Sequence, residues 1–345
     1  MGTRASSLAR ARPVGGAGGI VLTALGGGLP SGSRLIGIPD RYDLAATVGV
    51  LRHGRGDPTC RVRGGQWWFG QATPDGPATL LLEAAGGAVA ARAWGPGAGW
   101  AVAAAPDLVG AGDDPSGFVA RDPLAAAGAR LRAGWRIPRS RLVLQSLIPA
   151  IIEQKVTGRE AFAGYAALVR RFGEPAPGPG DDIGLFVPPS ATTWASIPSW
   201  AWLQAGVDRS RADTAMRAST YAGRVEECAE LTLAAAHRRL RALPGVGEWT
   251  VAEVAQRALG DPDAPSFGDY HFARLLTLAM TGVAGDDDAA RELLAPYAGQ
   301  RYRAAVYILA AAPSVARRGP RRALPTHLPD RSVSPGERSG QRQDR

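Results

Sequence analysis

Lysine is almost absent from this chain of 345 residues. Lys and Arg together number 40, yet Lys155 is the one lysine, so nearly all of the positive charge belongs to arginine. Arginine is too basic to act as a neutral nucleophile. Chemistry that needs a side-chain amine, such as formation of a Schiff base with a sugar, therefore depends on Lys155.

Cysteine and histidine are also scarce. The two cysteines, Cys60 and Cys228, lie far apart and lack the spacing of metal ligands. This excludes an iron–sulfur cluster held by four cysteines, and the four histidines form no metal-ligand motif. We predict no metal site, and two thiols that are buried and reduced.

No run of apolar residues is long enough to span a bilayer. Residues 15–29 follow several arginines and superficially resemble a signal peptide, but their glycines and the lack of a convincing cleavage site favour a disordered extension over residues 1–38. We therefore expect a cytoplasmic protein with no membrane partner. Residues 313–345 contain much Arg, Pro and Ser and no core-forming pattern, which predicts a disordered basic tail.

The composition suits a globular protein with an anionic partner. Hydrophobic residues make up 45% of the chain, the formal net charge is +9, and the isoelectric point is about 10.3. A basic surface is consistent with DNA, RNA or membrane binding and does not distinguish them. Because the excess is arginine in a chain rich in Ala and Gly, genomic base composition is an alternative source of the charge.

Residues 39–112 have the pattern of a small α/β domain. Short candidate strands separated by Gly and Pro turns predict an antiparallel meander covered by one helix. The candidate strands are residues 42–51, 59–63, 66–72, 78–83 and 88–94, and the helix is 97–108. Trp67, Trp68 and Phe69 are adjacent in one strand and point to alternate faces, so packing in the core is favoured over a platform for stacking bases.

Helical patterns dominate residues 118–312, after a turn at 113–117 that we take as the linker. The predicted helices are residues 142–156, 160–172, 208–221, 230–242, 269–281, 287–294 and 300–311. Residues 175–189 are rich in Pro and Gly and predict an exposed connector. The predicted fold class is therefore α+β, with a small antiparallel sheet domain before an all-helical body.

The most informative segment is the glycine-spaced turn at residues 243–250, between two helical runs. Gly245 and Gly247 allow positive φ angles and close approach of another backbone. At the N-terminus of a helix such a turn directs free N–H groups outward and suits a phosphate. A helical hairpin that uses glycine only to turn tightly is the alternative.

The order L-P-G-V-G-x-W-T, followed by the pair Gly268-Asp269 twenty residues after the Trp, resembles the helix-hairpin-helix DNA glycosylase superfamily. Within it, the pattern resembles the bacterial 3-methyladenine DNA glycosylase II proteins, over residues 42–312. The resemblance implies that double-stranded DNA with damaged bases is the partner. It also implies that the hairpin, with Gly245, Val246, Gly247 and Thr250, holds a DNA phosphate.

The same resemblance makes Asp269 the catalytic carboxylate. The competing interpretation is that Asp269 only caps the following helix, and the two roles are compatible. At the hairpin position where bifunctional glycosylase/lyases have a lysine, this chain has Trp249. The resemblance therefore implies a monofunctional enzyme that uses water and needs no organic cofactor. A monovalent cation bound by hairpin carbonyls is implied only by the family.

The resemblance assigns further residues to DNA and to the damaged base. Trp249 and Tyr307 are expected to line the base pocket, where Trp249 would stack on a cationic alkylated purine such as 3-methyladenine. Gln154 is expected at the lesion and Lys155 in the position of the wedge that fills the gap left by the extruded base. Lys155 as a simple phosphate contact is the alternative. Arg303 is expected to face the DNA.

Departures from the family leave the lesion undetermined, since Glu253 occupies a position at which relatives have an aromatic residue. Two rivals to a hydrolytic glycosylase stay open. One is a catalytically inactive helix-hairpin-helix protein that binds damaged DNA, and the other is a glycosylase for another lesion class with lyase activity through Lys155. We expect a monomer, associated with the bacterial nucleoid.

Overall fold

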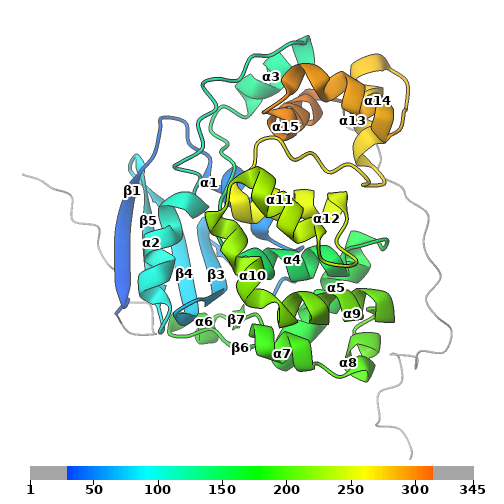
Figure 1. Cartoon of the computed structure of the whole chain (residues 1–345). Helices are drawn as coiled ribbons and strands as arrows, with labels where there is room; N and C mark the ends of the chain where they lie inside the picture. The colour runs from blue at the N-terminus through cyan, green and yellow to red at the C-terminus, as the bar shows by residue number, and fades with distance from the viewer. Residues whose placement is uncertain (1–28, 314–345) are drawn as a thin grey trace, which may run out of the picture.

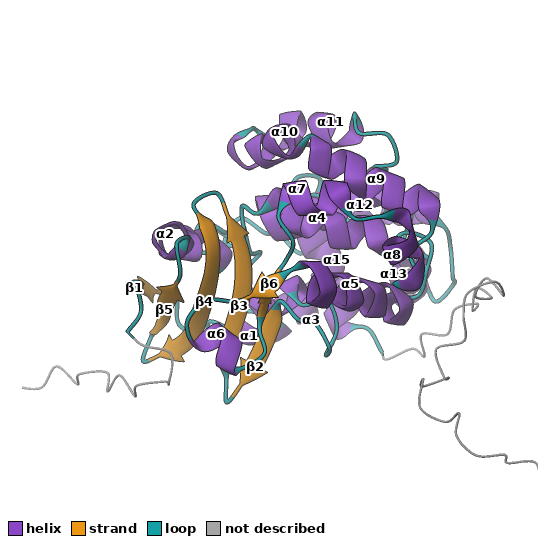
Figure 2. Ribbon diagram, turned by 90° about the horizontal axis from the view of Figure 1, so that it is seen from below, coloured by secondary structure: helices purple, strands orange, loops and turns teal. Residues whose placement is uncertain are grey.

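The computed structural model describes residues 29–313. An antiparallel five-stranded sheet lies at one side of the molecule and a helical body at the other (Figures 1 and 2). The strand order is β1-β5-β4-β3-β2. The strands are β1 (Gly32–Gly37), β2 (Cys60–Arg63), β3 (Gln66–Thr73), β4 (Gly76–Ala85) and β5 (Ala88–Trp94). The predicted α+β class and the meander from β2 to β5 are confirmed.

The prediction that residues 1–38 form a disordered extension is wrong for its last part. β1 pairs with β5 along its whole length, with Ile36 opposite Val89. Ile36 is buried, whereas Arg34 and Leu35 are exposed. A strand that places one apolar side chain in the core gives almost no periodic signal, which is why the pattern missed it. Residues 1–28 and 314–345 lie outside the described residues.

The candidate strand at residues 42–51 is instead helical. Helix α1 (Leu44–Val48) begins after Asp43, whose side chain accepts a hydrogen bond from the N–H of Ala46, at 2.8 Å. It continues into the 3₁₀ turn η1 (Gly49–Leu51). Leu44 and Val48 are spaced four residues apart and both are buried, so the capped helical pattern outweighed the β-propensity of the segment.

Both faces of the sheet are covered. Helix α2 (Ala98–Leu108) packs on the face that carries Leu80 and Leu82. The other face carries Trp68 and Leu81, and it is covered by residues from the segment predicted as an exposed connector. That segment contains β6 (Glu174–Pro175), helix α6 (Pro179–Asp182) and β7 (Phe186–Val187). The connector prediction is wrong, because buried Ala176, Leu185 and Val187 complete this second core.

Most buried side chains of the described helical body belong to two cores. The larger one joins α4 (Val143–Ile152), α5 (Gly158–Phe172), α7 (Ala191–Ser196), α8 (Ser199–Gln204), α9 (Arg209–Thr220), α10 (Ala222–Glu226), η2 (Glu227–Glu230), α11 (Leu233–Arg241), α12 (Glu248–Val254) and the π-helical turn η3 (Ala255–Leu259). The smaller one joins α3 (Pro123–Leu131), α13 (Phe272–Thr281), α14 (Asp287–Leu294), η4 (Ala295–Tyr297) and α15 (Arg301–Ala311). Figure 1 shows α3, α13, α14 and α15 together at one end of the body.

The segment between η3 and α13 crosses from one helical core to the other. Ala264 packs in the larger core and Phe267 in the smaller one. Asp269 therefore lies where the two cores meet. Among the helices of residues 29–313, none combines the length and the apolar character that a membrane span requires.

Candidate active site

The turn between α11 and α12 has the conformation that the glycine pattern predicts. Gly245 has a φ of +93°, and a side chain there would overlap Thr214. The N–H of Val246 donates to the carbonyl of Leu243 at 3.0 Å and closes the turn. Gly247 precedes α12 without a capping side chain, so the first N–H groups of this helix stay available to an anion.

The side chain of Gln154 forms hydrogen bonds with two groups of this hairpin. Its Nε2 donates to the carbonyl of Gly245 at 3.0 Å and to the Oγ1 of Thr250 at 2.8 Å. The side chain of Thr250 is buried. The side chains of Gln154 and Thr250 therefore contact each other across the hairpin, which brings together two of the predicted DNA-binding residues.

Lys155 follows directly and is exposed, at the end of a short turn after α4. Its φ is +56°, in the left-handed region that a residue with a long side chain seldom occupies. The turn is fixed on its far side by the capping box of α5, in which Thr157 and Glu160 exchange hydrogen bonds. A constrained backbone thus presents the one lysine of the chain next to the hairpin.

Two hairpin carbonyls that face neighbouring helices already have donors. The carbonyl of Pro244 accepts from Nη1 of Arg217 at 3.1 Å, and that of Gly245 accepts from Gln154. The guanidinium of Arg217 thus places a positive charge beside the carbonyl of Pro244, where a bound cation would otherwise lie. These oxygens therefore do not favour a cation site. Residues 29–313 contain no group of three or more His, Cys, Asp or Glu that could hold a metal ion.

Asp269 follows Gly268, whose φ is +88°. One carboxylate oxygen, Oδ1, accepts from the N–H groups of His271 and Phe272, both at 2.8 Å, and so caps the start of α13. The other, Oδ2, accepts no hydrogen bond from any described residue. The side chain is half-buried, so one oxygen is fixed by the backbone while the other stays free.

Trp249 lies against this turn. A Cβ atom added to Gly268 would be 3.5 Å from Cβ of Trp249, so the hairpin helix and the Asp269 turn are in contact. The indole is half-buried, and its Nε1 has no hydrogen-bond partner among the described residues. The structure thus brings the Asp269 turn and Trp249 together. Gln154 contacts the hairpin turn from which the helix of Trp249 begins.

The structure places Tyr307 in a different cluster. Its ring is buried, and its centroid lies 5.0 Å from that of Phe118 and 5.8 Å from that of Trp135. No ring contact joins Tyr307 to Trp249 in the described part of the chain. Its place in a base pocket stays a prediction.

The expectation that Arg303 faces DNA is wrong. Its side chain has no exposed surface, pairs with Asp113 and donates from Nε to Oε1 of Gln300 at 2.7 Å. Asp113 also accepts from the N–H of Ile137 at 2.9 Å. The aspartate that the sequence assigns to a linker turn therefore neutralises Arg303 inside the protein.

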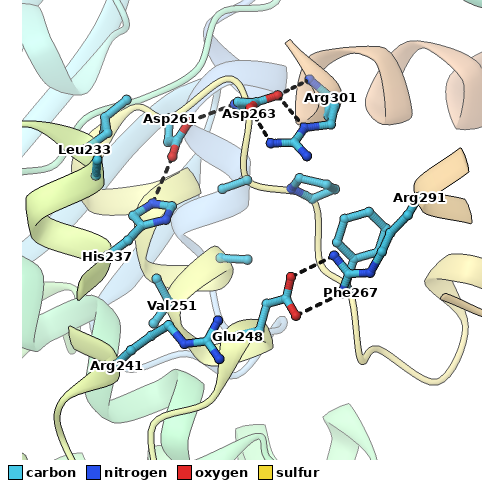
Figure 3. A pocket seen from close by; sticks show the side chains of 14 residues that line it. Leu233, His237, Arg241, Glu248, Val251, Asp261, Asp263, Phe267, Arg291 and Arg301 are labelled. Carbon is cyan, nitrogen blue, oxygen red and sulfur yellow. Dashed lines mark hydrogen bonds and ion pairs between the residues drawn. The ribbon is translucent and has the colours of Figure 1, made fainter. Parts of the chain in front are cut away.

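A pocket lies beside the hairpin but does not contain the predicted site. Its volume is about 350 Å³, and α11, α12, the 261–267 segment, α14 and α15 surround it (Figure 3). Three pairs of its charged groups are in contact: Glu248 with Arg291 at 2.8 Å, His237 with Asp261 at 2.9 Å and Asp263 with Arg301 at 2.5 Å. Although burial opposes it, hydrogen bonding from Arg301 lowers the pKa of Asp263. Neither Asp269 nor Trp249 lines this cavity.

The residues that hold the Asp269 turn have little signal in the local sequence. Glu253, noted only as a departure from the family, is bonded to Ser266, and Asp287 accepts the N–H of Gly268. The spacing of Glu253 and Arg257, four residues apart on a helix, was the available signal of an ion pair. Nothing in the local pattern indicated the contacts with Ser266 and Gly268, because they join different elements.

No family model matches the chain. A curated relative from Mycobacterium tuberculosis, named "Probable bifunctional transcriptional activator/DNA repair enzyme AlkA", is 31% identical over 159 residues, which are 44% of this chain and 31% of the relative. The match thus spans about a third of that longer protein.

Solved structures match much more of the chain. A 3-methyladenine DNA glycosylase from Archaeoglobus fulgidus superposes with a TM-score of 0.67 and 16% identity, over 80% of this chain and 97% of that one. An 8-oxoguanine glycosylase/lyase from Clostridium acetobutylicum gives a TM-score of 0.63 and 12% identity, over 83% and 99%. The chain therefore has the fold of the helix-hairpin-helix DNA glycosylases, as its sequence motif predicts.

Proposed function

We propose that this protein is a DNA glycosylase that removes damaged bases by hydrolysis, with Asp269 as its catalytic carboxylate. The observation that carries the proposal is the position of Asp269. Its Oδ1 is fixed by two backbone N–H groups, its Oδ2 is free, and its turn contacts Trp249 on the hairpin helix. The similarity to AlkA and the shared glycosylase fold support the same conclusion.

The chemistry follows from this arrangement. The damaged nucleotide must leave the duplex, and flipping it costs roughly a few kcal/mol of stacking and pairing. The N–H groups at the start of α12 would hold a backbone phosphate, and exposed Lys155 would enter the gap left by the flipped base or contact a phosphate. These contacts position the sugar of the flipped nucleotide near Asp269.

Breaking the N-glycosidic bond sends its electron pair to the leaving base and places positive charge on the deoxyribose. A nearby carboxylate stabilises such an oxocarbenium-like species. The free Oδ2 of Asp269 is the group for this role, and it can accept a proton from the water that adds to the sugar carbon. No organic cofactor or metal takes part in these steps.

Alkylated purines are the proposed substrate class. They carry positive charge, and a half-buried indole attracts cations through its ring face. Trp249 lies beside the Asp269 turn and is the aromatic residue best placed to stack on such a base. The AlkA relative and the archaeal 3-methyladenine glycosylase favour this class, whereas the 8-oxoguanine enzyme makes oxidised purines the alternative.

Hydrolysis without strand cleavage is proposed because Trp249 stands where a lyase would need an amine. The alternative amine is Lys155, which is exposed on the turn after α4. A protein that only binds damaged DNA is the remaining rival. The retained Gly268-Asp269 pair, which lies against Trp249 of the hairpin helix, argues against it.

The test is base release from methylated duplex DNA, with the strand checked for breaks before alkali treatment and with borohydride added in parallel. The proposal predicts free 3-methyladenine or 7-methylguanine, an intact strand and no covalent adduct. A borohydride adduct lost in Lys155→Ala would instead establish a lyase. Salt-sensitive binding without release from methylated, deaminated or oxidised DNA would establish the binding-only rival.

A further inference from the structure

Each of the three residues that precede Asp269 is held by a separate contact. The Oγ of Ser266 donates to Oε1 of Glu253 at 2.6 Å. The guanidinium carbon of Arg291 lies over the ring of Phe267, 3.9 Å from the ring centroid. The N–H of Gly268 donates to Oδ2 of Asp287 at 2.8 Å. A turn held this closely has little freedom to move.

Glu253 is the innermost of these anchors. It is 9% exposed and lies four residues after Trp249 on α12, so the two side chains share one side of the helix. Its Oε2 accepts from Nη1 of Arg257 at 2.6 Å, while Nε of Arg257 donates to the carbonyl of Val50 at 3.1 Å. The carboxylate is therefore fixed by an ion pair on one oxygen and bonded to Ser266 through the other.

Ser266 connects Glu253 to the backbone of Asp269. Its hydroxyl accepts from Nε2 of Gln256 at 3.0 Å while it donates to Glu253, so two residues that follow Trp249 in the chain fix it. Its carbonyl accepts the N–H of Asp269 at 3.1 Å. A continuous set of hydrogen bonds thus joins the helix that carries Trp249 to the backbone of Asp269.

We propose that Glu253, acting through Ser266, is a positioning residue for Asp269 and sets where its free carboxylate oxygen lies relative to the hairpin. This inference rests on the proposed function of Asp269. Glu253 is buried, and its carboxylate bonds to Arg257 and Ser266 rather than to the hairpin turn or Lys155, so its effect is expected on the chemical step rather than on DNA affinity. A misplacement of about 1 Å in such a site costs roughly a hundredfold in rate.

Ser266→Ala is the decisive variant, because it removes the link and leaves the buried Glu253–Arg257 pair intact. Ser266→Thr keeps the hydroxyl. Ser219→Ala is the matched control, since the hydroxyl of Ser219 is buried and bonds only to the carbonyl of Ala215 in its own helix. Glu253→Ala is less informative because it leaves the Arg257 guanidinium without its carboxylate and is expected to destabilise the protein.

The measurements are the single-turnover rate of base release from methylated duplex DNA and the dissociation constant for the same DNA. Ser266→Ala is expected to lower the rate by about 10- to 100-fold with an affinity within about twofold of the wild type. Ser266→Thr should restore most of the rate, and Ser219→Ala should leave it unchanged.

Two results would overturn the inference, and they are distinguishable. An active wild type matched in rate by Ser266→Ala would show that the link does not position Asp269, while leaving the proposed function in place. A wild type that releases no base from methylated, deaminated or oxidised DNA would refute the proposed function and this inference together.

Discussion

Asp269 shows how two interpretations of one residue apply to different atoms. Its Oδ1 accepts from the backbone N–H groups of His271 and Phe272 and so holds the start of α13, for which His271 is the N-cap residue. Its Oδ2 takes no hydrogen bond from the described residues and is the atom proposed for catalysis. The cap orients the carboxylate, so the structural role supports the chemical one.

Gly245 and Gly247 look equivalent in the sequence but differ in the structure. Gly245 has a φ of +93° and contacts Thr214, whereas Gly247 has a φ of −93° and open space where a Cβ would lie. We predict that Gly245→Ala lowers the free energy of unfolding by at least about 2 kcal/mol, through backbone strain and steric overlap. Gly247→Ala should change it by less than about 0.5 kcal/mol. Urea unfolding of the two variants checks this, and equal losses would contradict it.

Arg303 gives a second test at the residue scale, because the sequence and the structure assign it different roles. Arg303→Met would leave the Asp113 carboxylate buried without its ion-pair partner, and we predict a loss of about 3–5 kcal/mol in the free energy of unfolding. The salt dependence of DNA binding should not change, since the side chain has no exposed surface.

Arg274 on α13 is the control for Arg303, because it is exposed. Arg274→Met should change the free energy of unfolding by less than about 0.5 kcal/mol. If Arg303→Met instead left stability intact and reduced the salt slope of DNA binding by about one, the assignment to DNA would be right and the buried pair unimportant.

At the scale of elements, the sequence predicted most of the strands, helices and turns that have a local pattern. β3 and β5 are short apolar runs buried on both faces, α5 has an apolar face that ends at Gly173, and the hairpin has its glycines, so each was predicted within a few residues. What failed depended on partners distant in sequence. β1 needed β5 beside it, and the 175–189 segment needed the Trp68 face of the sheet.

The residues of the candidate site also differ in whether a local sequence pattern predicts them. Asp269, Trp249 and the hairpin follow from a motif, and the structure brings them into contact. The contact of Glu253 with Ser266 joins two elements and has no local signature. Arg303 was misassigned because the resemblance to the family motif identifies a basic residue but not the buried carboxylate that neutralises it.

The edge strand β1 gives a prediction at this scale. A chain that begins at Ile38 would lose the six paired residues of β1 and the buried side chain of Ile36, and would expose the backbone edge of β5. We predict a lower melting temperature and more aggregation than for a chain that begins at Leu29. Thermal unfolding monitored with light scattering compares the two, and identical melting would show that β1 adds nothing to stability.

At the scale of the whole molecule, the sheet domain is bonded to the elements that carry the site. Nδ1 of His53 lies 3.0 Å from Oε1 of Glu153, which directly precedes Gln154, and Nε of Arg257 donates to the carbonyl of Val50. The first contact reaches the turn that carries Lys155, and the second reaches the Glu253 anchor. The sheet domain therefore supports both sides of the predicted site rather than being a separate module.

Under the proposed function, the net charge of +9 would give the whole molecule a general attraction for DNA, which does not depend on the lesion. Lesion binding and catalysis would come from the small set of groups around Asp269 and Trp249. Affinity and chemistry are therefore expected to separate in mutants, with exposed arginines affecting binding and the Asp269 turn affecting the rate.

The most direct test of the central claim is the single-turnover rate of base release by the wild type and by Asp269→Asn, on the same methylated duplex. Asparagine keeps an oxygen that can cap α13 but removes the negative charge. We predict that DNA affinity and melting temperature stay close to those of the wild type, while the rate falls by at least about 100-fold. An Asp269→Asn variant that releases base at the wild-type rate would contradict the assignment of Asp269 as the catalytic carboxylate.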